Sequence, residues 1–200
     1  MKEHDHSIDA EVHRVDQSKR ALICDDVAQS EIFPHLDERG HARMVDVTAK
    51  PPTSRRAVAR GRVVMAAATA ASLAEATGPL RDALGVARTA GVFAAKRAFE
   101  LLPLCHPILI GDVSVEIELL EGSANLTASV EALDRTGVEM EALTACVVAA
   151  LSLYERCKDT DGSMSIEDVT VWEKSGGRSG TWERRKDGTV DHVAPGQPVG

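Results

Sequence analysis

The sequence predicts an α+β fold in which helices cover one face of an antiparallel sheet. Several segments alternate apolar and polar residues at period two, and Ala-rich segments of helical composition lie between them. Such alternation indicates strands with one buried face, which is typical of antiparallel sheets. Hydrophobic residues make up 44% of the chain and aromatic residues only 3%, so Ala, Val, Leu and Ile must build the core.

The first half of the pattern contains one strand and two helical regions. Residues 57–65, AVARGRVVM, alternate and predict a strand, and the Ala-rich residues 66–77 predict a helix. Pro79 suits the first turn of a second helical region, which we expect to break near Gly91 and to end before Pro103.

The second half contains a hairpin, a long helix and a last strand. The alternating residues 112–120 and 124–133 flank Glu-Gly-Ser at 121–123, which predicts a β-hairpin. Residues 140–158 form the strongest helical pattern in the chain, and 164–172 alternate again. The resulting order β-α-β-β-α-β is that of the ferredoxin-like fold.

Both ends of the chain lack such patterns. Residues 1–43 are rich in charge and predict a disordered N-terminal extension, and residues 181–200 predict a tail. The domain is therefore expected at 44–180. Five of the seven histidines lie in 1–43. These histidines are compatible with a metal site, although the composition of the segment favours a disordered extension without a function of its own.

Net charge, cysteine spacing and the distribution of apolar residues limit the classes of partner and the cellular location that we expect. A net charge of -8 argues against a nucleic-acid-binding protein. The four cysteines match neither a zinc site nor a disulfide framework, so we expect reduced thiols in the cytoplasm. The N-terminus is polar and no run of 18 apolar residues exists, so neither a signal peptide nor a membrane span is expected.

A basic segment precedes and enters the first strand. Arg56, Arg60 and Arg62 share one face of that strand, and Arg55 points to the other. Together with Lys50 they could hold phosphates through charge-assisted hydrogen bonds. Spacing alone favours an ordinary solvated strand face.

Candidate acid-base residues lie near both ends of the long helix. His106 lies between two prolines and suits proton transfer or substrate contact, although a lone histidine is more often structural. Glu139 and Glu141 begin the long helix, where the helix dipole already favours carboxylates. Glu155 and Lys158 share a face near its end, either as a surface ion pair or as a proton-transfer pair.

The Gly-rich segment KSGGRSG at 174–180 has an anion-binding composition. Its glycines can turn amides toward an anion, and Lys174 and Arg178 add positive charge. It lacks the spacing of a Walker loop, and alone it could equally be a flexible exit into the tail.

Five ordered blocks resemble the signature blocks of the MoaC family. They are MVDVTAK (44–50), AAKRAFELLPLCHP (94–107), TGVEMEALTA (136–145), LYERCK (153–158) and KSGGRSG (174–180). The resemblance implies a ferredoxin-like domain that assembles as a homohexamer, a trimer of dimers. It also implies conversion of 3′,8-cyclo-7,8-dihydro-GTP to cyclic pyranopterin monophosphate with release of pyrophosphate, in molybdenum cofactor biosynthesis. No redox cofactor is expected, and Mg²⁺ is compatible with the substrate triphosphate.

The resemblance also assigns roles to individual residues. The residues implied to bind substrate are Leu104, Cys105, His106, Glu139, Met140, Glu141, Arg55 and Lys174. The residues implied to be catalytic are Glu155, Lys158 and His106. The resemblance assigns no metal ligand.

Two positions depart from the family pattern. Glu155 stands where the family usually has the aspartate assigned as acid or base, and Leu80 stands where it has an essential lysine. Leucine transfers no proton, and the neighbouring Arg81 is a poor acid because its pKa is above about 12. The alternative is therefore a catalytically impaired paralogue that binds a nucleotide or pterin and regulates or joins an active synthase. The retained set of pocket residues favours the enzyme.

Overall fold

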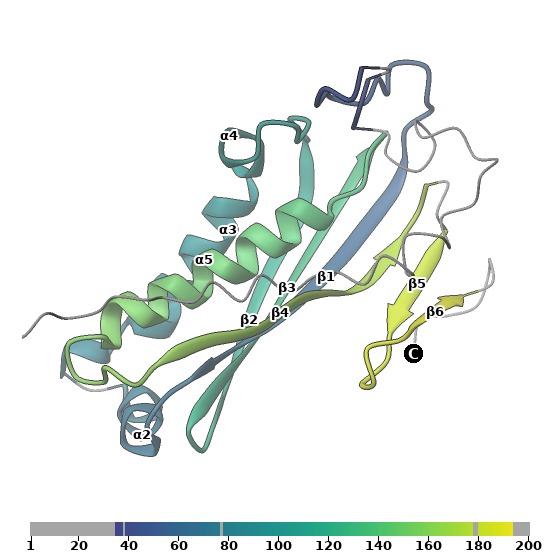
Figure 1. The fold of residues 1–200 in the computed structure, drawn as a ribbon. Helices are drawn as coiled ribbons and strands as arrows, with labels where there is room; N and C mark the ends of the chain where they lie inside the picture. The colour runs from purple at the N-terminus through teal and green to yellow at the C-terminus, as the bar shows by residue number, and fades with distance from the viewer. Residues whose placement is uncertain (1–34, 38, 77, 178–179, 194–200) are drawn as a thin grey trace, which may run out of the picture. The chain divides into compact units, whose positions relative to one another are not determined.

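The computed structural model describes residues 35–37, 39–76, 78–177 and 180–193 (Figure 1). The chain divides into two units, Met1–Arg43 and Met44–Gly200. In the first unit, Leu36 and Ala42 form an isolated antiparallel bridge. Residues 1–34 and 38 of the predicted N-terminal extension, and with them its first three histidines, lie outside the described residues.

The second unit is built on one antiparallel sheet of six strands. These are β1 (Thr53–Val64), β2 (Ile110–Leu120), β3 (Ser123–Asp134), β4 (Ser165–Ser175), β5 (Thr181–Arg184) and β6 (Val190–Val193). The strand order is β2-β3-β1-β4-β5-β6, and every neighbouring pair is antiparallel. The first four strands reproduce the ferredoxin-like order, which confirms the predicted fold class.

The helices lie on one face of this sheet (Figure 1). They are α2 (Ala67–Glu75), α3 (Ala83–Ala95), α4 (Ala98–Leu101) and α5 (Glu139–Cys157), with a 3₁₀ turn at Gly78–Leu80. Alternate residues of β3 face α5: Ala124, Leu126, Ala128 and Val130 are at most 1% exposed. None of the helices in the described part of the chain is long and apolar enough to span a membrane.

The second helical region differs from the predicted one. The helix begins at Ala83 rather than Pro79, after the 3₁₀ turn, and the break falls between Ala95 and Ala98. Gly91, the expected break, lies inside α3 and packs against α5. A Cβ at Gly91 would stand 2.8 Å from the Ala145 carbonyl oxygen. Glycine is therefore needed there for close helix packing and does not end the helix.

The predicted C-terminal tail carries two further strands. Lys174 of β4 pairs with Trp182 of β5, and β5 pairs with β6 through a turn at Asp187-Gly188. Gly188 has φ 86°, and Asp187 accepts hydrogen bonds from Thr189. An Asp-Gly pair between alternating residues is a hairpin signal, so the hairpin was detectable in the sequence.

Asp161 ties the turn after α5 to the start of α2. Its carboxylate accepts hydrogen bonds from the Ala66 amide at 2.7 Å, the Thr69 hydroxyl at 2.9 Å and the Ser163 hydroxyl at 2.6 Å. These bonds, led by that from Ser163, hold the pKa of Asp161 well below its usual range. The end of α5 is thereby fixed to its neighbours.

Gly91→Ala is expected to lower the free energy of unfolding by about 1–3 kcal/mol, because the added methyl overfills the α3–α5 contact. Urea unfolding followed by circular dichroism measures this change. Arg88→Ala, at an exposed position of the same helix, is the control and should stay within about 0.5 kcal/mol. Equal stability of both variants would contradict the close packing.

Candidate functional site

Arg55 is a buried charged side chain in the candidate site. It is 7% exposed, and its guanidinium donates to the backbone carbonyls of Asp134 at 3.1 Å and Arg135 at 3.2 Å. Gly177 lies against it with φ 77°, and any side chain at Gly177 would overlap the guanidinium. The backbone of the Gly-rich segment therefore packs directly against the Arg55 side chain, and glycine is needed there because a larger residue would not fit.

Lys174 and Glu139 form an ion pair between β4 and the first turn of α5. Their side chains are 18% and 21% exposed, so the pair is largely shielded from solvent. Gly137 makes room for it, since a Cβ there would overlap the Glu139 carboxylate. One turn of helix and one strand end thus place a lysine beside a carboxylate at the same end of the domain.

Glu141 and Cys105 form the deepest contact of the site. The Cys105 thiol donates to Glu141 Oε1 at 3.3 Å, and Glu141 is 2% exposed. Burial is the main cause that raises the pKa of Glu141, with Glu139 and Asp134 adding repulsion. Burial, followed by the Glu141 charge, raises the pKa of Cys105 to about 12. The thiol is therefore a hydrogen-bond donor here and a poor nucleophile.

His106 lies in the loop between α4 and β2 and is half-buried. Its Nε2 is 2.8 Å from the carbonyl oxygen of Val45, so a tautomer with Nε2–H donates to that oxygen. Asp46 is close enough for the His106 charge to help lower its pKa, after the larger effect of hydrogen bonds from Thr48. The segment of residues 44–50 therefore lies against the histidine loop.

Five of the predicted substrate-binding residues lie at the end of the domain where α5 begins, and we call them the N-terminal cluster. It consists of Arg55, Cys105, Glu139, Glu141 and Lys174. Leu104 and His106 flank Cys105 in the same loop, and Met140 is 42% exposed between the two glutamates. All eight predicted substrate-binding residues thus lie at or beside the beginning of α5.

The structure does not bring Glu155 and Lys158 to this cluster. Lys158 Nζ is 2.9 Å from Glu155 Oε2, and the hydrogen bond raises the pKa of Lys158. Both side chains are well exposed, at the other end of α5. The helix from Glu139 to Cys157 has 19 residues, or roughly 28 Å of rise, so one small molecule cannot span it.

Leu80 lies at the same end of the domain as Lys158. Gly91 of α3 packs against Ala145 and Ala149 in the middle of α5. After α3 the chain continues through α4 to Cys105, which contacts Glu141 at the beginning of α5. The two helices therefore run antiparallel. The start of α3 is therefore near the end of α5 (Figure 1). Leu80 is half-buried against the core, and Arg81 is exposed just before α3.

The arginines on the other face of β1 are paired with carboxylates of neighbouring strands. Arg56 contacts Glu173 at 2.6 Å, and Arg62 contacts Glu167 at 2.9 Å. Arg60 lies over the ring of Trp172 at 4.7 Å. These side chains lie on the face without helices, as a solvated strand face would, and Arg56 lines a small pocket together with Lys174 of the N-terminal cluster.

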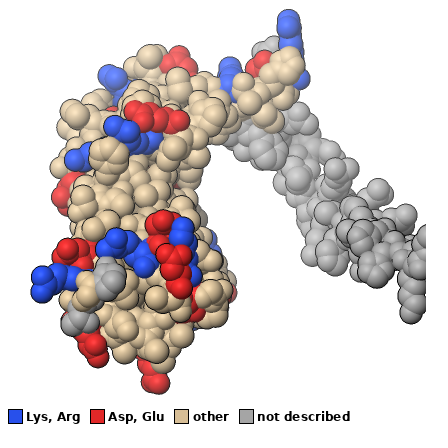
Figure 2. Space-filling view, turned by 90° about the vertical axis from the view of Figure 1, so that its left-hand side faces the viewer, with Lys and Arg blue, Asp and Glu red and all other residues tan. Residues whose placement is uncertain are grey.

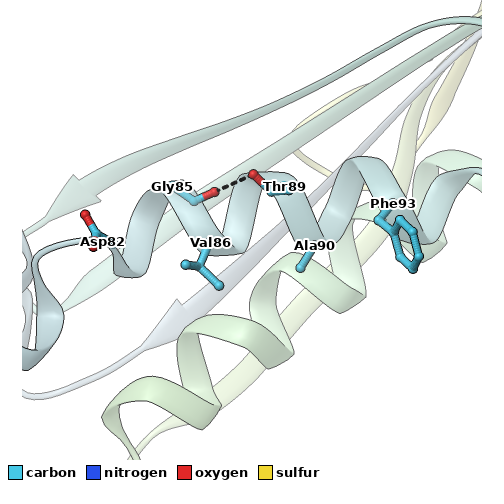
Figure 3. Close-up of a pocket in the computed structure, with 6 residues that line it drawn as sticks. All are labelled: Asp82, Gly85, Val86, Thr89, Ala90 and Phe93. Carbon is cyan, nitrogen blue, oxygen red and sulfur yellow. Dashed lines mark hydrogen bonds between the residues drawn. The ribbon is translucent and has the colours of Figure 1, made fainter.

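A groove on α3 contains none of the predicted site residues. It has a volume of about 570 Å³ and is lined by Asp82, Gly85, Val86, Thr89, Ala90 and Phe93, which follow one side of the helix (Figure 3). Val86 and Phe93 are 47% and 55% exposed. Among the described residues, no three His, Cys, Asp or Glu side chains gather as a metal site would require.

Sequence reasoning missed the backbone groups that hold the site. The carbonyls of Val45, Asp134 and Arg135 fix His106 and Arg55. Every residue has a backbone carbonyl, so the sequence does not indicate which carbonyls will bind a side chain. Val45 does lie in the block 44–50, which was recognised by its resemblance to the family. Arg178 lies outside the described residues, so its predicted charge contribution has no structural counterpart here.

Most of the chain is similar to known proteins. A sequence model of the MoaC family matches residues 44–177. A cyclic pyranopterin monophosphate synthase of Thermomicrobium roseum is 52% identical over 155 residues, which is 76% of this chain and 93% of that protein. The protein of the same name from Chloroflexus aurantiacus is 49% identical over 152 residues, or 75% and 93%. Cyclic pyranopterin monophosphate synthase 3 of Mycobacterium tuberculosis is 50% identical over 161 residues, or 80% and 90%.

The raised pKa of Cys105 predicts slow alkylation of its thiol. At pH 8 its rate with iodoacetamide should be lower than that of a free cysteine peptide by a factor on the order of 10³, because almost no thiolate is present. The rate should rise about tenfold per pH unit up to about 12. Peptide mass spectrometry measures it. Glu141→Gln removes a negative charge and should speed the reaction; a Cys105 that reacts like the free peptide would contradict the burial.

Proposed function

Because the chain belongs to the MoaC family, we propose that it is an active cyclic pyranopterin monophosphate synthase. It converts 3′,8-cyclo-7,8-dihydro-GTP to cyclic pyranopterin monophosphate and releases pyrophosphate, as a lyase of molybdenum cofactor biosynthesis in the cytoplasm. The observation that supports this proposal is that all eight residues predicted to bind substrate lie at or beside the beginning of α5.

The chemistry of this site suits a triphosphate substrate. Arg55 and Lys174 supply positive charge beside a helix N-terminus, which favours anionic oxygens. Positive charge placed before the reaction stabilises the negative charge that develops as pyrophosphate leaves. Ring rearrangement needs proton transfers, and Glu155 and Lys158 provide a hydrogen-bonded acid-base pair. Glu155 keeps the carboxylate of the family pattern with one more methylene.

The N-terminal cluster and the Glu155–Lys158 pair can act on the same substrate molecule only if one of them comes from a second copy of the chain. They lie at opposite ends of α5, so an antiparallel pair of subunits would bring the N-terminal cluster of one chain to Lys158 of the other. Each active site is then shared, and three such dimers make the homohexamer of the family. The partner's Cys105 and His106 approach Leu80, Glu155 and Lys158 in this arrangement.

The outer side of α3 is the surface that suits this contact. On the side of the domain shown in Figure 2, an uncharged zone lies between two groups of charged side chains, one above it and one below it. A two-fold axis near Thr89 would set Phe93 against the partner's Gly85 and Asp82 beside the partner's Lys96. Such a dimer would pack the apolar groove of one chain against that of the other and place opposite charges beside each other at its ends.

A direct assay tests the proposed function. Purified protein is incubated with 3′,8-cyclo-7,8-dihydro-GTP, and the pyranopterin and pyrophosphate are measured, with Mg²⁺ and with a chelator in parallel. His106→Ala should lower turnover or binding while the fold stays intact. Nucleotide binding without any product would support the non-catalytic alternative.

Leu80→Lys is expected to raise the rate. If a general acid is missing at this position, the natural chain works more slowly than a lysine-bearing relative by a factor on the order of 10² to 10⁴. The variant should recover part of that factor in kcat with little change in KM. Leu80→Met is the control and should leave the rate unchanged. A natural rate equal to that of the relative, with nothing added by lysine, would place the proton transfer elsewhere.

Two inactive variants should restore each other if the site is shared. His106→Ala and Lys158→Ala impair opposite ends of α5, and exchange of subunits regenerates intact sites in mixed dimers. After complete exchange about a quarter of the sites are intact. Activity of the mixture, with exchange verified by native mass spectrometry, measures this recovery. Absence of recovery would place each site within one chain, and Phe93→Asp in both variants should prevent exchange and recovery alike.

A further inference from the structure

The face of the sheet without helices has a pocket of its own. The pocket has a volume of about 400 Å³ and is lined by residues of β1, β2, β3 and β4. Pockets of this size hold small organic molecules in other proteins. None of the described residues that line it belongs to the N-terminal cluster or to the Glu155–Lys158 pair. The pocket is therefore separate from both groups of the proposed active site.

The irregular course of β4 shapes this pocket. The register of β4 against β1 shifts twice, and Trp172 lies in one shift and Asp168 in the other. Asp168 also adopts a left-handed conformation with φ 55°. Both residues line the pocket. Bulges turn a side chain to a new direction and are frequent beside binding sites, where strained backbone also concentrates. The two shifts thus place an aromatic ring and a carboxylate at the pocket.

Arg60 and Trp172 form a flat wall of the pocket. The Arg60 guanidinium lies over the Trp172 ring, 4.7 Å from its centroid. The Arg60 side chain is 44% exposed, so this wall is accessible from solvent. Guanidinium and indole groups are both planar, and both stack on aromatic ligands. A flat ring system is therefore the shape of ligand that fits this wall.

The β3 side of the pocket carries polar groups that are free to bind a ligand. Asn125 lies opposite Arg62 in the sheet, and Thr127 lies opposite Arg60. The side chains of Asn125 and Thr127 are half-buried and make no hydrogen bond to another described residue. An amide and a hydroxyl can each donate and accept hydrogen bonds. The ligand is therefore expected to carry both donors and acceptors.

The charges of the pocket are balanced. Its lining contains two arginines, Arg60 and Arg62, and two carboxylates, Glu118 and Asp168. Arg62 is also paired with Glu167 at 2.9 Å. A phosphate would have to compete with these carboxylates for the arginines, and a cation would meet the arginines themselves. The part of the ligand that enters the pocket is therefore expected to be uncharged.

We infer that this pocket binds an uncharged bicyclic nitrogen heterocycle of the purine type. The ring system stacks on the wall of Arg60 and Trp172, and its edge exchanges hydrogen bonds with Asn125 and Thr127. An asparagine amide can form two hydrogen bonds with the amino group and ring nitrogen of adenine. The inference goes beyond the proposed function, because the pocket contributes nothing to the reaction.

Tryptophan fluorescence tests the inference in the full-length chain. The sequence has two tryptophans, Trp172 and Trp182, so Trp182→Phe leaves Trp172 as the reporter. Adenosine should quench its emission until the pocket is saturated. Uridine has the same sugar but a single ring, and it should bind about 10-fold more weakly because it stacks over less area.

The second tryptophan is the control for the position of the ligand. Trp182 lines a different pocket, next to Lys174. In Trp172→Phe, where Trp182 is the reporter, adenosine should leave the emission unchanged. Quenching of Trp182 alone would place adenosine at the N-terminal cluster and overturn the inference.

Matched variants separate binding from a merely structural role of the polar groups. In the Trp182→Phe background, Asn125→Leu should weaken adenosine binding about 10-fold and Thr127→Val about 3- to 10-fold. Ser129→Ala removes a hydroxyl from the same strand outside the pocket and should leave the affinity unchanged. The inference would be overturned by absence of saturable quenching, by equal affinity for adenosine and uridine, or by unchanged affinity in both pocket variants.

Discussion

The structure depends on the close approach of α5 to the sheet and to α3, which small side chains allow. A Cβ at Gly61 would lie 3.1 Å from Cys146 Sγ, and one at Gly91 would lie 2.8 Å from the Ala145 carbonyl. Alanines fill most of the remaining contacts on α5. The low aromatic content of the chain follows from this spacing, since large rings would hold the layers apart. The direction of α5, and with it the position of both functional groups, is fixed by this packing.

The sequence was sufficient for the elements whose hydrophobic period is strong. β1, β2, β3, β4 and α5 were all predicted to within about four residues at each end, because alternation or helical period runs through each of them. The start of α3 was misplaced because a proline suits a 3₁₀ turn as well as an α-helix. The break in the second helical region was predicted at the wrong place because the sequence does not distinguish a glycine needed for close helix packing, such as Gly91, from one that ends a helix. β5 and β6 were missed because four residues are too few to display a period, so that the Asp187-Gly188 turn between them was the one signal of the hairpin.

The candidate site was only partly predictable. Motif resemblance named Cys105, Glu141 and Lys174, but their contacts cross 36 residues in one case and join a strand to a helix in another. Periodicity cannot report such pairings, nor can it show that one glutamate is buried while its neighbour Glu139 is paired. The length of α5 did allow the separation of Glu139 from Lys158 to be foreseen, because helix rise is independent of tertiary context.

The hairpin of β5 and β6 has a consequence for association between sheets. It pairs only with Glu173 and Lys174, so the first half of β4 has no strand on its outer side among the described residues. Free strand edges invite addition of a foreign strand, and proteins prevent this with bulges and charges. Register shifts against β1 interrupt β4, and Asp168 adopts a left-handed conformation with φ 55° beside Glu167. This half of the strand is therefore an irregular, acidic edge that discourages aggregation through the sheet.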